Sequence, residues 1–150
     1  MTHYLIRHAH AVPDEENPIR PLSEWGRKQV AALCVSLRAS SFEPAEIWHS
    51  PLARARETAA LLAAGLELSA KVEETEGLEP GDDPRVIARA LSSKRREIAV
   101  VGHEPHLGIL AGLMVNGGHP GALFDFPKAG ALALRRVGPR WQGVWVAGRP

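Results

Sequence analysis

Apolar positions along the chain alternate between short runs typical of buried strands and longer segments with the spacing of helices. The short runs predict strands at residues 2–7, 46–49, 98–101, 131–137 and 144–147, and Val72 marks a further minor strand. Residues 9–21 are polar and contain three prolines, so this segment is predicted to be a loop.

Helices are predicted between these strands, where cap residues precede apolar positions three or four residues apart. The predicted caps are Ser23, Ser50 and Asp83, and a proline follows each of the last two as the first helical residue. A fourth helix extends through Val115. The predicted apolar positions of the first and third helices are Val30, Leu33, Cys34, Leu37, Val86, Ile87, Ala90 and Leu91.

This alternation of strands and helices predicts the fold class. It favours a three-layer α/β/α sandwich with a mainly parallel central sheet and helices on both faces. The length of 150 residues fits one hydrophobic core, so we expect residues 1–150 to form a single domain.

Composition and charge exclude several classes of protein. With 18 basic and 17 acidic residues and a net charge of +1, the chain has no global charge suited to nucleic acid or an anionic membrane. The single cysteine, Cys34, cannot form an internal disulfide. The N-terminus does not resemble a signal peptide and no apolar run approaches the ~20 residues of a membrane span, so we expect a cytoplasmic monomer.

The candidate catalytic residues lie where predicted strands lead into helices. Arg7 and His8 end the first strand, Arg54 lies in the first turn of the second helix, and His103 follows the 98–101 strand. The carboxyl ends of parallel strands meet at one sheet edge, so we expect these four side chains to converge. Arginines match phosphate oxygens and neutral imidazole is a nucleophile, so the pattern indicates a site for phosphoryl transfer.

Three segments resemble motifs of the histidine phosphatase superfamily, which includes the phosphoglycerate mutases. Residues 5–9, with Arg7-His8, are similar to its Arg-His-Gly signature, and residues 50–58 are similar to its Ser-Pro-x-x-Arg-Ala-x-x-Thr segment. Residues 101–103 resemble its Gly-His element. The resemblance implies a phosphoglycerate mutase-like fold and a phosphohistidine intermediate on His8, with Arg7, Arg54 and His103 binding the phosphoryl oxygens.

Within that superfamily, the short chain and residues 20–23 followed by Gly26 resemble the SixA-type phosphohistidine phosphatases. This resemblance implies that Arg20 is an additional phosphate ligand. A loop ion pair from Arg20 to Asp14 or Glu15 is the alternative interpretation.

The sequence departs from the family pattern at two points. Ala9 replaces the glycine of the signature, and its methyl group fits if the φ angle there is negative. Many relatives carry a glutamate between the second and third motifs that protonates the leaving group. The candidates for the general acid here are Glu76 and Glu79, with Asp82 and Asp83 beyond them, and Glu79 is the predicted one.

The segment 65–96 is too short for the long cap that encloses small metabolites in mutase-like relatives. An open site suits phosphohistidine presented by another protein, so we expect a phosphoprotein partner, no metal and no organic cofactor. A small-molecule phosphomonoesterase of the same superfamily is the main alternative.

Two other classes of protein are alternatives. A metal-dependent hydrolase could use His8, His10, His103, Glu104 and His106 as ligands. Arg7 and Arg54 would then face a divalent cation, which is electrostatically unfavourable. A non-catalytic phospholigand-binding module is the remaining alternative, although such a module could use arginines alone. The position of residues 124–128 relative to the site does not follow from the sequence.

Overall fold

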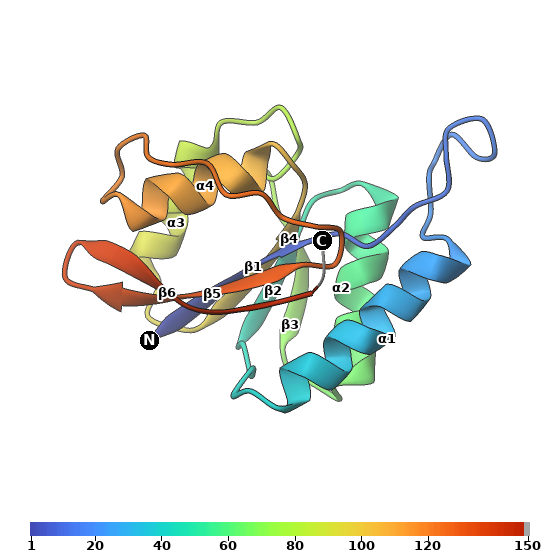
Figure 1. The fold of residues 1–150 in the computed structure, drawn as a ribbon, viewed down its shortest axis with the longest axis horizontal. Helices are drawn as coiled ribbons and strands as arrows, with labels where there is room; N and C mark the ends of the chain where they lie inside the picture. The colour runs from blue at the N-terminus through green and yellow to red at the C-terminus, as the bar shows by residue number, and fades with distance from the viewer. Residues whose placement is uncertain (149–150) are drawn as a thin grey trace.

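One twisted sheet with a pair of helices on each face organises the computed structural model, which describes residues 1–148 (Figure 1). The strands are β1 (Thr2–Arg7), β2 (Glu46–His49), β3 (Lys71–Glu74), β4 (Ile98–Gly102), β5 (Ala131–Val137) and β6 (Arg140–Ala147). The helices are α1 (Glu24–Arg38), α2 (Ala53–Gly65), α3 (Pro84–Ser93) and α4 (His106–Val115). The three-layer α/β/α prediction is confirmed.

The sheet has the strand order β3-β2-β4-β1-β5-β6. The pairs β2–β3, β2–β4 and β1–β4 are parallel, whereas β1–β5 and β5–β6 are antiparallel. The prediction of a mainly parallel sheet therefore holds for the N-terminal strands and fails for the last two. Only Gly138 and Pro139 join β5 to β6, and a connection this short permits an antiparallel hairpin but no crossover.

Alternate residues of the strands face two separate hydrophobic cores. Tyr4 and Ile6 of β1 face α1 and α2, whereas Leu5 between them faces α3 and α4. The predicted face of α1 is confirmed, since its buried residues include Val30, Leu33, Cys34 and Leu37. In α3 the prediction for Val86 was wrong, because Ile87, Ala88 and Leu91 are buried and Val86 is 52% exposed.

Two element boundaries differ from the predictions. Helix α2 begins at Ala53 after Leu52, which provides no side-chain cap, and Ser50, the predicted cap, contacts His103 Nε2 and the Leu52 N–H. Strand β6 begins at Arg140 rather than at residue 144, since alternating polar residues at its start conceal the pattern. Ser23 caps α1 as predicted and accepts a hydrogen bond from the Gly26 N–H.

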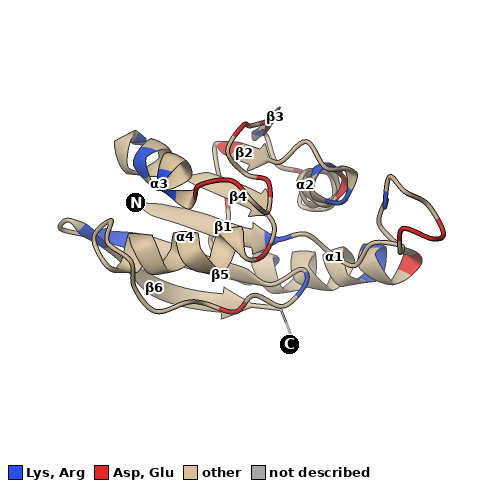
Figure 2. Ribbon diagram, turned by 90° about the horizontal axis from the view of Figure 1, so that it is seen from above, with Lys and Arg blue, Asp and Glu red and all other residues tan. Residues whose placement is uncertain are grey.

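The carboxyl ends of the parallel strands β1, β2 and β4 lie at one edge of the sheet. The loop of residues 13–20 protrudes from the molecule next to this edge, with acidic residues along it (Figure 2). No helix in the described residues is long and apolar enough to cross a membrane.

Candidate active site

His8 and His103 lie side by side because β1 and β4 are parallel neighbours. Arg7 is paired with Gly102 in the register of the two strands, and each histidine is the next residue of its chain segment. The His8 N–H donates to the Gly102 carbonyl at 3.0 Å, and the two ring centroids are 5.0 Å apart. Both histidines are buried.

The His8 ring is fixed in one tautomer by its own backbone. Its Nδ1 lies 2.7 Å from the Ala9 carbonyl, which can only accept, so Nδ1 carries the hydrogen and Nε2 keeps its lone pair. Burial, followed by the positive charges of Arg54, Arg7 and Lys128, lowers the pKa of His8 to about 4 against the opposing effect of the Ala9 bond. The ring is therefore neutral at physiological pH, in the state that the predicted role as nucleophile requires.

His103 has the complementary arrangement. The Ser50 Oγ accepts a hydrogen bond from the Leu52 N–H at 3.3 Å and lies 2.6 Å from His103 Nε2. Ser50 is fully buried and its hydroxyl hydrogen has no other acceptor among the described residues, so the hydroxyl donates to Nε2 and the ring hydrogen lies on Nδ1. This Nδ1 is buried and has no hydrogen-bond partner in the described part of the chain. Burial and then nearby His8 and Arg54 lower the pKa of His103 to about 3, so it is a neutral donor.

The two arginines predicted for the site stay available to an anion. Arg7 uses Nη1 to donate to the Phe126 carbonyl at 2.8 Å, and its buried Nε has no partner among the described residues. Neither Arg7 nor Arg54 forms an ion pair within residues 1–148. Burial, and then the charge of Arg20, lowers the pKa of Arg54. Positive charge without an ion pair in the described residues favours a bound oxyanion, although Asp14 partly opposes the effect of Arg20 on Arg54.

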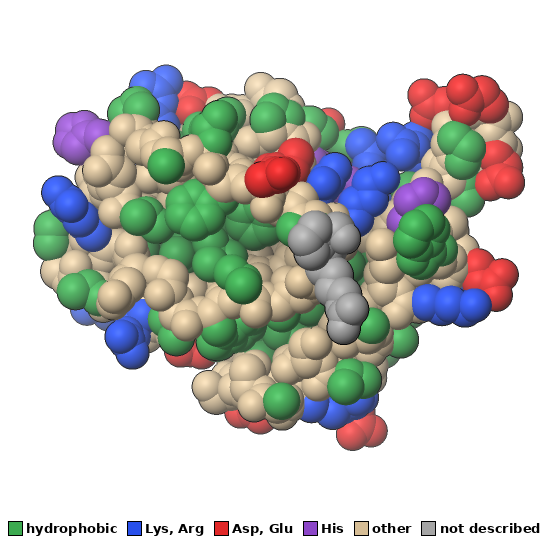
Figure 3. All heavy atoms as spheres, in the orientation of Figure 1, with side chains coloured by type: hydrophobic (Ala, Val, Ile, Leu, Met, Phe, Trp, Pro, Cys, Tyr) green, Lys and Arg blue, Asp and Glu red, His purple; other side chains and the backbone are tan. Residues whose placement is uncertain are grey.

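Arg20 lies close enough to Arg54 and Lys128 to lower the pKa of each. It also takes part in the alternative loop contact, with its Nε donating to the Val12 carbonyl at 3.0 Å and lying 3.7 Å from an Asp14 oxygen. Its φ of 53° is in the left-handed region, which is uncommon for a residue other than glycine. Figure 3 shows Lys and Arg side chains gathered at the base of the protruding loop, with histidine among them.

Thr58 joins the second motif to the first. Its Oγ1 accepts the Ala9 N–H at 3.0 Å and donates to the Arg54 carbonyl at 2.7 Å. Ala9 is fully buried, and its φ is not positive, as its tolerance in place of glycine requires. The segment that contains Ala9 therefore needs no glycine at this position, and Thr58 holds it against α2.

The sequence did not indicate the role of Glu104. Its two carboxylate oxygens accept the Gly108 N–H at 2.7 Å and the Phe126 N–H at 3.0 Å. Because the Phe126 carbonyl accepts from Arg7, Glu104 fixes the loop that orients Arg7. The proximity of Glu104 to His103 in the sequence was the only signal.

Glu79 is exposed, and its carboxylate forms no hydrogen bond or ion pair with another described residue. Its N–H donates to an Asp82 oxygen at 2.9 Å. The preceding Leu78 is buried beside Gly102, so the segment borders the site. Its role as general acid stays a prediction.

The metal-ligand interpretation has no cluster to support it. Within residues 1–148 no three His, Cys, Asp or Glu side chains are grouped to hold a metal ion. The His10 Nδ1 lies 2.6 Å from Ser23 Oγ and its ring stacks on Trp25, while both Glu104 oxygens bind backbone N–H groups.

Comparison with known proteins identifies the family. Residues 3–79, more than half of the chain, match the model of the histidine phosphatase superfamily, branch 1. The chain belongs to the histidine phosphatase superfamily. The matched segment contains Arg7, His8, Arg20 and Arg54, and membership of this superfamily supports phosphatase activity.

Other similar proteins extend the comparison over nearly the whole chain. An uncharacterized protein of Picosynechococcus sp. is 31% identical over 146 residues, covering 93% of this chain and 87% of that protein. The structure of the protein histidine phosphatase SixA complexed with tungstate has a TM-score of 0.86 and 21% identity, covering 99% of this chain and 97% of that one. The complex of mycobacterial glucosyl-3-phosphoglycerate phosphatase with VO3 has a TM-score of 0.71 and 18% identity, covering 96% and 98%. These structures share the fold of the chain.

Proposed function

We propose that this superfamily member is a metal-independent phosphatase that removes the phosphoryl group from phosphohistidine in a protein partner through an intermediate on His8. The observation that carries the proposal is the pairing of a neutral His8 Nε2 lone pair with a His103 Nδ1–H that has no partner among residues 1–148. Two arginines without ion pairs in the described residues, Arg7 and Arg54, complete a site for a compact oxyanion.

The reaction has two steps. The His8 Nε2 lone pair forms a bond to phosphorus while the bond from phosphorus to the substrate nitrogen breaks, and the leaving imidazole takes up a proton. Water then attacks the phosphorus of phospho-His8, which releases inorganic phosphate and restores the neutral ring. In both steps Arg7, Arg54 and His103 stabilise the charge on the equatorial oxygens, with Arg20 as a further ligand.

The need for a residue that protonates the leaving group depends on the substrate. An imidazole leaving group takes its proton readily from solvent, whereas an alkoxide leaving group depends on a placed acid. Glu79 is the proposed donor for that second case.

The fold likeness to SixA supports the protein substrate. The site is also bordered by short loops, since α2 and β4 are separated only by β3, α3 and their connections. The second candidate function, a small-molecule phosphomonoesterase, is supported by the fold likeness to glucosyl-3-phosphoglycerate phosphatase. Both candidates use the same His8 chemistry.

The test compares dephosphorylation of a histidine-phosphorylated carrier protein with that of a small aryl phosphate, each with and without EDTA. His8→Ala is the inactive control. EDTA-resistant turnover of the carrier protein, lost in the variant, is the expected result. Preference for the aryl phosphate would instead support the phosphomonoesterase, and activity retained by His8→Ala would overturn the mechanism.

A further inference from the structure

We propose that Lys128 is an additional phosphate-binding residue of this site, presented to the phosphoryl group by a turn that is fixed to the backbone of Arg7 and His8. The inference rests on the proposed function for the identity of the substrate phosphoryl group. It adds a side chain that lies outside the motifs at residues 5–9, 50–58 and 101–103.

The turn is attached directly to the segment that carries the nucleophile. The Gly130 N–H donates to the Pro127 carbonyl at 2.8 Å, which closes a four-residue turn with Lys128 in its second position. The Ala129 N–H lies 3.1 Å from both the Arg7 and the His8 carbonyl oxygens, and the Arg7 N–H donates to the Gly130 carbonyl at 2.9 Å. The position of Lys128 is thereby fixed relative to His8.

Ala129 shows that this turn is held against a local preference. It is buried and has a φ of 57°, a left-handed conformation that costs a residue with a side chain about 1 kcal/mol or more. Such conformations persist where surrounding contacts determine them, and they concentrate at functional sites. Here the shared hydrogen bonds to Arg7 and His8 supply those contacts.

Lys128 differs from the other lysines in its surroundings. Lys28 and Lys71 form ion pairs with Glu24 and Glu73, and Lys94 lies over the Trp48 ring at 5.8 Å. Lys128 is half-buried and forms no ion pair within the described residues.

The charged side chains that act on the pKa of Lys128 are of the same sign as Lys128 itself. Burial, and then the charges of Arg7 and Arg20, lower its pKa, and its own charge contributes to the lowered pKa of His8. A partly desolvated cation beside other cations is unfavourable unless an anion compensates it. A phosphoryl group on or beside His8 is the anion that this site is proposed to bind.

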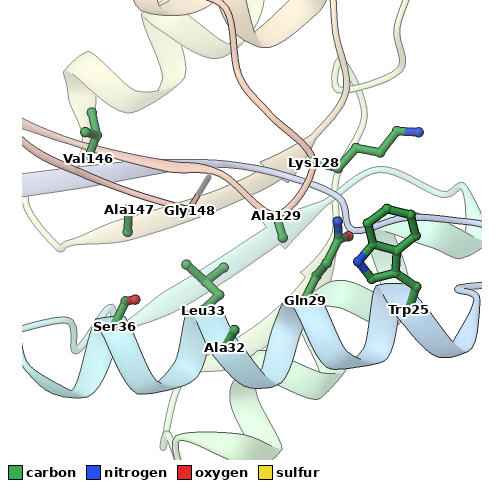
Figure 4. Close-up of a pocket in the computed structure, with 10 residues that line it drawn as sticks. All are labelled: Trp25, Gln29, Ala32, Leu33, Ser36, Lys128, Ala129, Val146, Ala147 and Gly148. Carbon is green, nitrogen blue, oxygen red and sulfur yellow. The ribbon is translucent and has the colours of Figure 1, made fainter. Parts of the chain in front are cut away.

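Figure 4 shows where the Lys128 side chain lies. The residue borders a groove of about 490 Å³ between α1 and the end of β6, together with Trp25 and Gln29. Its side chain extends away from Val146 and ends on the Trp25 side of the groove. The His10 ring stacks on that Trp25, so this side of the groove adjoins the segment that follows His8.

The experiment measures binding of inorganic phosphate by isothermal titration calorimetry, alongside kcat and KM for an aryl phosphate. Lys128→Gln is compared with Lys128→Arg, which keeps the charge, and with Lys71→Gln, a matched control on an exposed lysine of β3. Near-ultraviolet circular dichroism verifies that each variant is folded.

We expect Lys128→Gln to weaken phosphate binding by roughly 10-fold or more, as loss of a charge-assisted contact implies, and Lys128→Arg to stay within about 3-fold of the wild type. Lys71→Gln should leave binding unchanged. Unchanged phosphate affinity in folded Lys128→Gln would overturn the inference while leaving a His8-dependent phosphatase intact. Lys128-dependent phosphate binding without turnover by the wild type would support this site and overturn the proposed function.

Discussion

His8 presents the lone pair of Nε2 and His103 presents the hydrogen of Nδ1, although both residues follow equivalent parallel strands. The difference arises from their partners, a backbone carbonyl for His8 and the Ser50 hydroxyl for His103. The His8 ring is thereby suited to act as a nucleophile, and the His103 ring is suited to donate a hydrogen bond to an oxyanion.

The neutral state of His8 predicts the acid limb of the pH profile. Its pKa is lowered to about 4, so protonation removes the nucleophile only below that pH rather than near the ordinary value of 6.5. We expect kcat/KM, corrected for ionisation of the substrate, to stay level from neutral pH to about pH 5 and then to fall. A midpoint near the ordinary histidine value would contradict this assignment.

Ser50 is a positioning residue, since it acts through His103. In Ser50→Ala the buried Nε2 of His103 loses its partner, so the ring is no longer fixed with its hydrogen on Nδ1. We expect kcat to fall roughly 10-fold, about 1.4 kcal/mol of transition-state stabilisation, with the protein still folded. Ser93→Ala, at an exposed serine of α3, is the control. Equal kcat values for the two variants would contradict the role of Ser50.

The site residues that lie where strands lead into helices could be predicted from the sequence. Arg7, His8, Arg54 and His103 stand at corresponding junctions, so parallel pairing alone brings them together. Lys128 and Glu104 could not be placed in this way, because their positions depend on backbone hydrogen bonds between the 124–130 loop, β1 and α4. No periodic pattern in the sequence encodes such contacts.

At the scale of elements, Glu104 fastens the start of α4 to the loop that orients Arg7. A glutamine in its place has one acceptor oxygen and cannot accept both the Gly108 and the Phe126 N–H groups in the same way. We expect Glu104→Gln to lower kcat/KM by roughly 10-fold through a looser Arg7, about 1.4 kcal/mol.

Glu43→Gln provides the comparison for this variant, since Glu43 is exposed and forms no ion pair in the part of the chain that the structure describes. Steady-state kinetics on the aryl phosphate measures both variants. If Glu104→Gln matched Glu43→Gln in kcat/KM, the contacts of the Glu104 carboxylate with Gly108 and Phe126 would have no part in catalysis.

The helices and parallel strands were predictable because each buries a regular face. The C-terminal hairpin was harder to predict from the sequence, since β6 is an edge strand with exposed polar residues between apolar ones. Its antiparallel direction follows from a two-residue connection rather than from any apolar pattern.

At the scale of the whole molecule, the four buried histidines with a lowered pKa make folding sensitive to acid. Burial is the largest cause of the lowered pKa in each of His3, His8, His103 and His106. The unfolded chain therefore binds more protons than the folded one below the ordinary pKa of 6.5, so stability falls as the pH drops through this range. For His8 the loss continues down to its folded pKa of about 4 and is on the order of 3 kcal/mol.

Urea unfolding between about pH 7 and about pH 4.5 measures this dependence. We expect a shallower dependence in His8→Gln, and the wild-type dependence in His119→Gln, because His119 is exposed. Identical slopes for all three proteins would show that His8 is not held neutral by the fold.

The most direct test of the account is to look for the phosphoryl group on His8 itself. The protein is mixed with a phosphohistidine carrier protein, quenched in alkali within the first turnover, digested and sequenced by mass spectrometry. We predict a phosphorylated peptide with the modification on His8 and none on His103, and its disappearance in His8→Ala. Turnover without any phosphorylated His8, or phosphate on another residue, would contradict the proposed mechanism.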